Sequence, residues 1–282
     1  EQFGEERVID SPLSESLIVG ASIGAAAYGM RPVAEIQFAD FIMPAVNQII
    51  SEAAKMRYRS NNGWQCPLVI RAPYGGGVHG GLYHSQSVES IFASVAGLKI
   101  VTPSTPYDVY GLLTASIRDD DPILFLEHKR CYRLIKGEVP DMPYTVQIGK
   151  ANVVREGTDV TVISYGLMVH YALQAAEKLE REGINTHVLD LRTIRPLDKD
   201  AVLAAVAKTG KVLIVHEDNK TGGFGGEISA LIAEEALFEL DAPIVRLGGP
   251  DVPAMPFNST LEKAYLLNPQ KIEAAIRDLA EF

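Results

Sequence analysis

The chain has 282 residues, of which 47% are hydrophobic and 22% charged, values typical of a globular protein with a large core. Its formal net charge of −10 would repel the phosphates of a nucleic acid, so we expect no nucleic-acid partner. Two cysteines are too few for a disulfide framework, and neither a membrane span nor a signal peptide is evident in the sequence.

The first half alternates helix-like and strand-like segments. Asp10-Ser11-Pro12 offers a capping side chain followed by a proline, which is a typical start of a helix. Short apolar strands alternating with helices predict a parallel sheet covered on both faces. The expected elements are a helix over 14–30, a strand over 33–38, a helix over 42–59, a strand over 67–71, a helix over 87–96, a strand over 98–101, a helix over 106–118 and a strand over 123–127.

Residues 128–149 interrupt this alternation, because they are charged, contain two prolines and show no helical period. A second α/β set follows. We therefore place a first domain at 1–135, a linker at 136–149 and a second domain at 150–282. The second set is expected to contain strands over 160–164, 186–191, 212–216 and 243–247, and helices over 169–182, 199–208, 227–237 and 269–279.

A glycine-rich segment, RAPYGGGVHGGLYHSQS (71–87), follows the predicted strand at 67–71. Its glycines match the spacing of a dinucleotide-binding loop, but five residues separate the last of them from the next helix, and no acidic residue ends the next strand. His79 and His84 lack nearby cysteine or acidic ligands for zinc. A solvated turn and a loop that delivers a histidine to a reacting group both remain open.

Several stretches together resemble the β subunit of the thiamine-diphosphate-dependent E1 component of 2-oxo acid dehydrogenase complexes. The resemblance covers essentially the whole chain and leans toward the branched-chain member. It implies a transketolase-like pyrimidine-binding domain, with part of its N-terminal portion preceding Glu1, and then a transketolase C-terminal-type domain. The stretches that carry it are DSPLSES (10–16), RPVAEIQFADF (31–41), LYHSQS (82–87), IRDDDP (117–122), EHKRCYR (127–133), DLRTIRPLD (190–198) and HEDNKTGGFGGEIS (216–229).

The same resemblance implies an α2β2 heterotetramer in which the α subunit holds Mg²⁺ and the diphosphate through a GDG motif. This chain has no GDG sequence. The resemblance also implies docking on a lipoyl acyltransferase, E2. It places the protein in the cytoplasm of a bacterium, or in the mitochondrial matrix of a eukaryote.

Residue by residue, the resemblance assigns Glu15 to the pyrimidine N1′ of thiamine diphosphate, where a shared proton activates the cofactor. It makes Phe41 the ring that stacks on the pyrimidine, and it places Leu13 and Gln37 nearby. Taken alone, Glu15 also suits the first turn of a helix, and Phe41 also suits a core.

His84 matches a family histidine that donates protons as the acyl group passes to the lipoyl disulfide. Histidine suits this role because its usual pKa of ~6.5 allows both protonation states near neutral pH. A loop histidine is more often solvated, so the assignment depends on the family pattern.

The resemblance further implies a structural potassium site. Oxygen ligands suit such a hard cation, although Asp121 stands where the family has asparagine, which adds a charge. An acidic, solvated helix end is the simpler interpretation. The implied ligands are oxygens of Leu68, Ser116, Ile117, Asp119 and Asp121.

The resulting hypothesis is oxidative decarboxylation of branched-chain 2-oxo acids followed by acyl transfer to the lipoyl group of E2, by an enzyme active only with its α subunit. A pyruvate or acetoin dehydrogenase β subunit is the enzymatic alternative. A non-catalytic assembly subunit is the alternative from another class.

Overall fold

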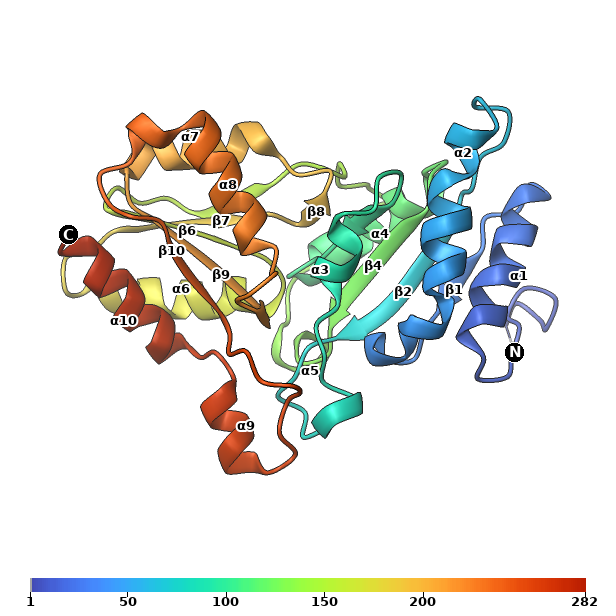
Figure 1. The fold of residues 1–282 in the computed structure, drawn as a ribbon, viewed down its shortest axis with the longest axis horizontal. Helices are drawn as coiled ribbons and strands as arrows, with labels where there is room; N and C mark the ends of the chain where they lie inside the picture. Colours follow the sequence, from blue (N-terminus) through green and yellow to red (C-terminus); the bar gives the residue numbers. More distant parts are fainter. Residues whose placement is uncertain (1) are drawn as a thin grey trace.

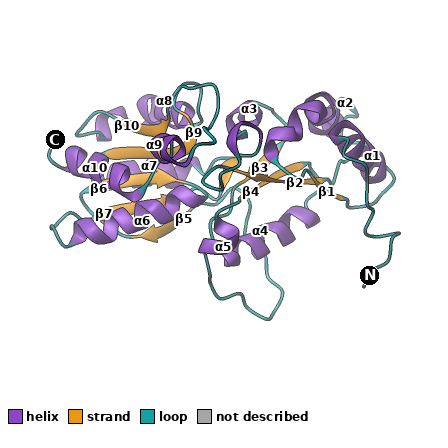
Figure 2. Ribbon diagram, turned by 90° about the horizontal axis from the view of Figure 1, so that it is seen from below, coloured by secondary structure: helices purple, strands orange, loops and turns teal. Residues whose placement is uncertain are grey.

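The computed structural model describes residues 2–282, which form two α/β units side by side (Figure 1). Each unit contains a five-stranded sheet, and helices lie on both faces of each sheet (Figure 2). Within the described range no helix is both long and apolar enough to cross a membrane. The predicted fold class, two successive α/β units, is confirmed.

The first unit has the strand order β1-β2-β4-β3-β8, in which β1 to β4 are parallel and β8 is an antiparallel edge. Its helices are a mixture of regular and irregular segments. The elements are α1 (Glu15–Ala27), β1 (Val33–Glu35), η1 (Ala39–Ala45), η2 (Gln48–Glu52), η3 (Ala53–Lys55), α2 (Met56–Arg59), β2 (Val69–Tyr74), η4 (Gly81–Tyr83), α3 (Glu89–Ala93), β3 (Lys99–Val101), α4 (Pro106–Arg118), β4 (Ile123–His128) and α5 (Cys131–Leu134).

The second unit has the strand order β10-β9-β6-β7-β5, again parallel except for one antiparallel edge, β5. Its central strands β6, β7 and most of β9 are buried, as expected for parallel strands covered on both faces. The second half of the chain contains β8 (Thr193–Arg195), which belongs to the first sheet, and the elements of the second unit: β5 (Asn152–Arg155), β6 (Val160–Ser164), α6 (Leu167–Glu180), β7 (Thr186–Asp190), α7 (Lys199–Thr209), β9 (Val212–Asn219), α8 (Gly225–Glu235), η5 (Leu237–Glu239), β10 (Val245–Gly249), α9 (Ser259–Tyr265) and α10 (Pro269–Ala280).

The segment after β1 departs from the prediction. The strand expected over 33–38 ends at Glu35, and helical structure begins at Ala39, three residues earlier than expected. This helical stretch is not one α-helix, because it passes through 3-10, π and 3-10 turns before α2. Pro44 lies near the end of the first of these segments, η1, and has no N–H to bond the residue one turn earlier.

The two units share more than a linker. β8 comes from the second half of the chain but pairs with β3 of the first sheet, and the N–H of Thr102 donates to the carbonyl of Arg192 at 2.8 Å. Neither β8 nor the short helix α5 was predicted. Residues 136–149 contain neither helix nor strand.

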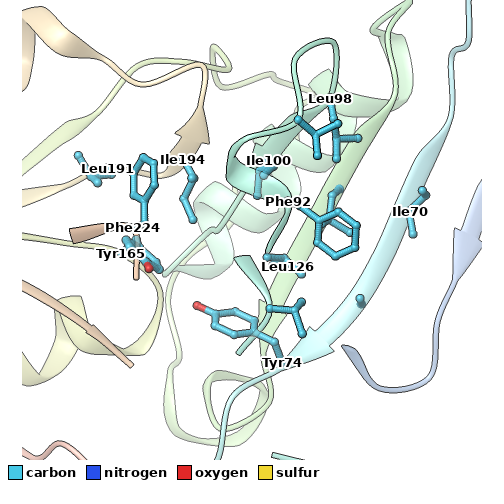
Figure 3. Close-up of a cluster of buried hydrophobic side chains, with 14 of the residues drawn as sticks. Ile70, Tyr74, Phe92, Leu98, Ile100, Leu126, Tyr165, Leu191, Ile194 and Phe224 are labelled. Carbon is cyan, nitrogen blue, oxygen red and sulfur yellow. The ribbon is translucent and has the colours of Figure 1, made fainter. Parts of the chain in front are cut away.

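One hydrophobic cluster spans both units. Figure 3 shows Ile194 of the second half near Ile100 of the first, and both are buried in one cluster with Phe224 and Phe92. Because this apolar surface is continuous, burial stabilises the relative placement of the two sheets as well as each unit.

Candidate functional site

Three neighbouring parallel strands bring the site together. β1, β2 and β4 lie side by side, so their carboxyl ends meet at one edge of the sheet, where ligand sites of α/β proteins usually lie. Phe41 follows β1, His84 follows β2 in the glycine loop, and Lys129 directly follows β4.

His84 is enclosed by aromatic side chains at this edge. Its ring centroid lies 4.6 Å from that of Phe38 and 5.4 Å from that of Phe41, and both contacts are edge-to-face. His84 is half-buried, whereas Phe41 is 37% exposed and presents part of its ring to solvent. The structure therefore brings two of the predicted site residues together and adds Phe38, whose ring contacts both of theirs.

Asp40 and Lys129 complete this cluster, and the sequence interpretation missed both. Asp40 Oδ1 accepts hydrogen bonds from the N–H groups of Ser85 and Gln86, at 3.2 and 3.1 Å, which holds the chain directly after His84. The ammonium of Lys129 lies 5.6 Å from the centroid of the Phe38 ring. Both residues stand in stretches that carry the family resemblance, and that is the signal by which they could have been found.

The Lys129 ammonium is buried, and nothing in residues 2–282 accepts a hydrogen bond from it. Burial lowers the pKa of Lys129 to about 8, although the carboxylates of Asp40 and Glu217 act in the opposite direction. One oxygen of Asp40 is likewise buried without a partner. Buried polar atoms without a partner are uncommon in proteins, and two of them at the carboxyl edge of the sheet mark this cluster as a candidate binding site.

Glu15 reaches the same region through helix α1. It is the first residue of that helix and is half-buried. The adjacent Ser16 donates a hydrogen bond to the carbonyl of Pro44 at 2.5 Å, and Pro44 lies in η1 together with Phe41. Glu15 is thus placed beside the element that carries Phe41.

The two remaining predicted cofactor residues are at the surface. Leu13 is 80% exposed, and Gln37 is exposed in the turn after β1. In the described part of the chain no side-chain hydrogen bond joins Glu15 or Gln37 to His84 or Asp40. The structure therefore brings Phe41 into direct contact with His84 and places Glu15 on a helix that contacts the element of Phe41. Leu13 and Gln37 are exposed to solvent.

A cavity of about 770 Å³ lies beside this cluster, between the two units. Asp40, Met43 and Gln86 line it from the first unit, while Asp218 and Thr221 line it from the second. Its size is that of a site for a cofactor or a drug-sized molecule.

The predicted potassium ligands lie at the opposite edge of the first sheet, where β2, β3 and β4 begin. Asp119 accepts two hydrogen bonds from the Lys99 ammonium, at 2.8 and 2.7 Å, and Asp121 lies 3.3 Å from the same nitrogen. The carbonyl oxygens of Leu68, Ser116 and Ile117 accept hydrogen bonds from the N–H of Ile123, the N–H of Asp119 and the guanidinium of Arg31.

Cationic side chains already neutralise the carboxylates of Asp119 and Asp121. Arg57 Nε lies 2.5 Å from Asp121, in addition to the Lys99 contacts. Residues 2–282 contain no group of three or more His, Cys, Asp or Glu side chains arranged to hold a metal ion. The side chains present fit a cluster of ion pairs better than a potassium site.

Comparison with known proteins decides the family. The family model of the transketolase pyrimidine-binding domain matches residues 1–135, and that of the transketolase C-terminal domain matches residues 149–272. The 2-oxoisovalerate dehydrogenase subunit beta of Bacillus subtilis is 69% identical over 282 residues, covering 100% of this chain and 86% of that protein. The chain belongs to the family of transketolase-type 2-oxo acid dehydrogenase β subunits.

Two further β subunits are similar to this chain at lower identity. The pyruvate dehydrogenase E1 component subunit beta of Bacillus subtilis is 46% identical, covering 100% of this chain and 86% of that protein. The 2-oxoisovalerate dehydrogenase subunit beta of Pseudomonas aeruginosa is 44% identical, covering 99% and 83%. A solved chain of a split-gene transketolase, an inactive beta4 tetramer, has a TM-score of 0.77 at 24% identity, covering 95% of this chain and 81% of that one, and it supports the fold alone.

Proposed function

We propose that this chain is the β subunit of an E1 enzyme that oxidatively decarboxylates branched-chain 2-oxo acids and passes the acyl group to a lipoyl group. The observation that carries the substrate class is the 69% identity to a 2-oxoisovalerate dehydrogenase β subunit, against 46% to a pyruvate dehydrogenase β subunit. The clustering of Phe41 and His84 at the carboxyl edge of the first sheet supports a catalytic rather than a purely structural role.

The residues at this edge fit thiamine diphosphate, whose thiazolium ring supplies the carbanion chemistry when it is bound. The partly exposed Phe41 ring would stack on the pyrimidine, and Glu15 would share a proton with its N1′ nitrogen. The unpartnered polar atoms of Asp40 and Lys129 would offer the cofactor further polar contacts. Leu13 and Gln37 would approach the aminopyrimidine from the open face.

His84 would give a proton to the lipoyl sulfur that is released when the disulfide opens. Its half-buried ring contacts Phe38 and Phe41, and this packing restricts its orientation, which suits a positioned proton donor.

We infer that the α subunit supplies the rest of the site. The sequence contains no GDG motif for Mg²⁺ and diphosphate, and four apolar side chains of α1, of the segment before it and of η1 (Leu13, Leu17, Phe41 and Met43) are each 37–80% exposed. An exposed apolar patch beside an incomplete site suits a subunit interface. Docking of the assembled E1 on E2 follows from the same reaction, because the acyl group must reach a lipoyl group.

The potassium ion stays a prediction. It would have to share Asp119 and Asp121 with Lys99 and Arg57, so its binding would require these ion pairs to rearrange. A rise in thermal stability with K⁺, but not with Na⁺ at equal ionic strength, would support the site.

The test is dye-linked oxidation of 3-methyl-2-oxobutanoate with thiamine diphosphate and Mg²⁺. It compares this chain alone, the chain with its α partner, and the same mixture carrying Glu15→Gln. We expect activity only when the unsubstituted chain is combined with its α partner. The chain alone lacks the rest of the site, and in Glu15→Gln the introduced amide cannot exchange a proton with the pyrimidine.

Each other outcome has a definite meaning. Activity that survives Glu15→Gln would contradict the placement of the cofactor. Turnover of pyruvate instead of the branched acid would favour the pyruvate or acetoin alternative. Full assembly with the α chain but no turnover of any 2-oxo acid would favour the non-catalytic subunit.

A further inference from the structure

The glycine loop over residues 75–87 is held by carboxylates that bind its backbone before and after His84, and we call these two parts its limbs. The limb after His84 is bound by Asp40 of the first unit, as described above. The limb before His84 is bound by two buried carboxylates of the second unit, Glu217 and Glu262. The proposed proton donor therefore lies between two anchored stretches of backbone.

Glu217, on β9, holds the start of the loop. Its Oε1 accepts a hydrogen bond from the N–H of Gly76 at 2.6 Å, and its Oε2 lies 3.1 Å from Nε2 of His128. Glu217 and His128 are both almost fully buried. Burial raises the pKa of Glu217, but His128, the Gly76 N–H and Lys129 outweigh it, so the pKa lies below its usual value and the carboxylate stays charged.

Glu262, on α9, holds the middle of the loop. Its Oε1 accepts hydrogen bonds from the N–H groups of Gly77 and His79, at 3.2 and 3.1 Å, and its Oε2 lies 2.5 Å from Nδ1 of His79. Glu262 is 1% exposed, whereas the His79 side chain is 61% exposed. His79 has a φ of 57°, a left-handed conformation that is unfavourable for a non-glycine residue and is held here by the three contacts.

Close packing accompanies these bonds. A side chain at Gly76 would overlap the sulfur of Met255, and one at Gly81 would come within 3.0 Å of the Phe257 ring. Met255 and Phe257 precede α9, which lies below the second sheet on the side that faces the first unit (Figure 1). The second unit thus fits the loop in shape as well as in charge.

We infer that Glu217 and Glu262 are positioning residues that hold the glycine loop so that His84 meets the lipoyl group, which makes the second unit a contributor to acyl transfer. The inference rests on the proposed function, since it assigns these residues to the step that His84 serves. Neither carboxylate contacts His84, so both act through the backbone of residues 76–79.

The test separates the two partial reactions of the complex with its α partner. Glu262→Ala and the isosteric Glu217→Gln are compared with Glu234→Ala, a control that removes an exposed carboxylate of α8 in the same unit. Dye-linked oxidation of 3-methyl-2-oxobutanoate does not use the lipoyl group, whereas acylation of a purified lipoyl domain does.

We expect acylation of the lipoyl domain to fall about tenfold or more relative to dye-linked oxidation in both variants, since displacing a reacting group by ~1 Å can cost up to ~100-fold. The control should change neither rate. An equal fall in the rates of both reactions would show that these residues have only a structural role. Unchanged acylation would overturn the inference.

Hydrogen exchange of the backbone amides of residues 75–87 provides a readout that does not depend on activity. Exchange should accelerate at Gly76 in Glu217→Gln, and at Gly77 and His79 in Glu262→Ala. Unchanged exchange in both variants would contradict the anchoring itself. Absence of dye-linked oxidation in the unsubstituted complex would instead contradict the proposed function, while the exchange data would still decide whether the loop is anchored.

Discussion

The buried ammonium of Lys129 is an unfavourable charge at the proposed site. Phe38 packs beside it, and no hydrogen-bond acceptor contacts it within residues 2–282. A buried lysine favours its neutral form, and this agrees with a pKa lowered to about 8. An anionic ligand at this edge of the sheet would supply the missing partner.

This lowered pKa makes stability depend on pH in the alkaline range. Between about pH 8 and the ordinary lysine value of 10.5, the unfolded chain holds a proton that the native Lys129 has lost, so the free energy of unfolding should rise with pH, by at most about 1.4 kcal/mol per unit. Lys129→Met should lack this rise in urea unfolding at pH 7–10, whereas the exposed Lys136→Met should keep it. If the free energy of unfolding changed with pH in the same way in Lys129→Met and in the natural protein, a lowered pKa of Lys129 would be contradicted.

The Phe41 ring gives the second prediction at this scale. Loss of a stacked ring costs roughly 0.5–1.5 kcal/mol beyond area burial, so Phe41→Leu should weaken thiamine diphosphate binding by about two- to tenfold in the assembled enzyme. Phe238→Leu replaces a ring that is 99% exposed in the second unit and is the matched control. Equal cofactor affinity in both variants would show that Phe41 does not stack on the pyrimidine.

At the scale of elements, the sequence predicted best where local signals are complete. α4 begins at Pro106 and ends at Arg118 as predicted, because the Thr105 side chain accepts a hydrogen bond from the N–H of Asp108 and a proline opens the first turn. β6 has the predicted bounds for a similar reason, being a short, fully buried run rich in β-branched residues.

Other elements depend on contacts that the sequence does not display. β8 has three residues and exists because β3, about ninety positions earlier, offers it an edge. The roles of Glu15, Phe41 and His84 were expected from the family resemblance, whereas the contacts of Lys129, Glu217 and Glu262 arise only when distant strand ends and α9 meet. Contacts between residues far apart in the chain leave no periodic pattern in the sequence, so the hydrophobic and polar patterns could not predict them.

The glycine loop allows a prediction about why this element needs glycine. Gly75 and Gly183 have similar φ values, 84° and 89°, but a side chain at Gly75 would overlap the His128 ring, whereas the space around Gly183 is open. Gly183→Ala should therefore cost only the left-handed strain, about 1–2 kcal/mol, and Gly75→Ala about 1–3 kcal/mol more from overpacking. Urea unfolding of the two variants measures the difference. An equal loss in the free energy of unfolding would mean that the loop shifts to accommodate the added methyl group without further strain.

At the scale of the whole molecule, the two units are joined by buried polar groups as well as by the shared core. Asp190, at the end of β7, is fully buried and accepts a hydrogen bond from Ser104 of the first unit at 2.5 Å. The carbonyl of Ser104 lies 2.7 Å from Nε2 of His170. Burial raises the pKa of Asp190 to about 7, against the hydrogen bonds from Ser104 and the Arg192 N–H.

The raised pKa determines the sign of a pH effect on the junction between the units. Between about pH 4 and pH 7 the native Asp190 keeps a proton that the unfolded chain has lost, so its contribution to the free energy of unfolding is complete below pH 4 and is lost as pH rises to 7. Asp190→Asn cannot titrate, and its free energy of unfolding should exceed that of the natural protein increasingly across this window.

Asp200→Asn provides the control for that comparison, because Asp200 is exposed on α7 of the same unit. Urea unfolding at pH 4.5, 5.5, 6.5 and 7.5 should give parallel curves for the control and the natural protein, and a shallower decline for Asp190→Asn. If all three curves were parallel, Asp190 would be ionised in the native protein throughout. Arg192, whose guanidinium lies 2.7 Å from Asp108, would then have to neutralise two carboxylates at the junction rather than one.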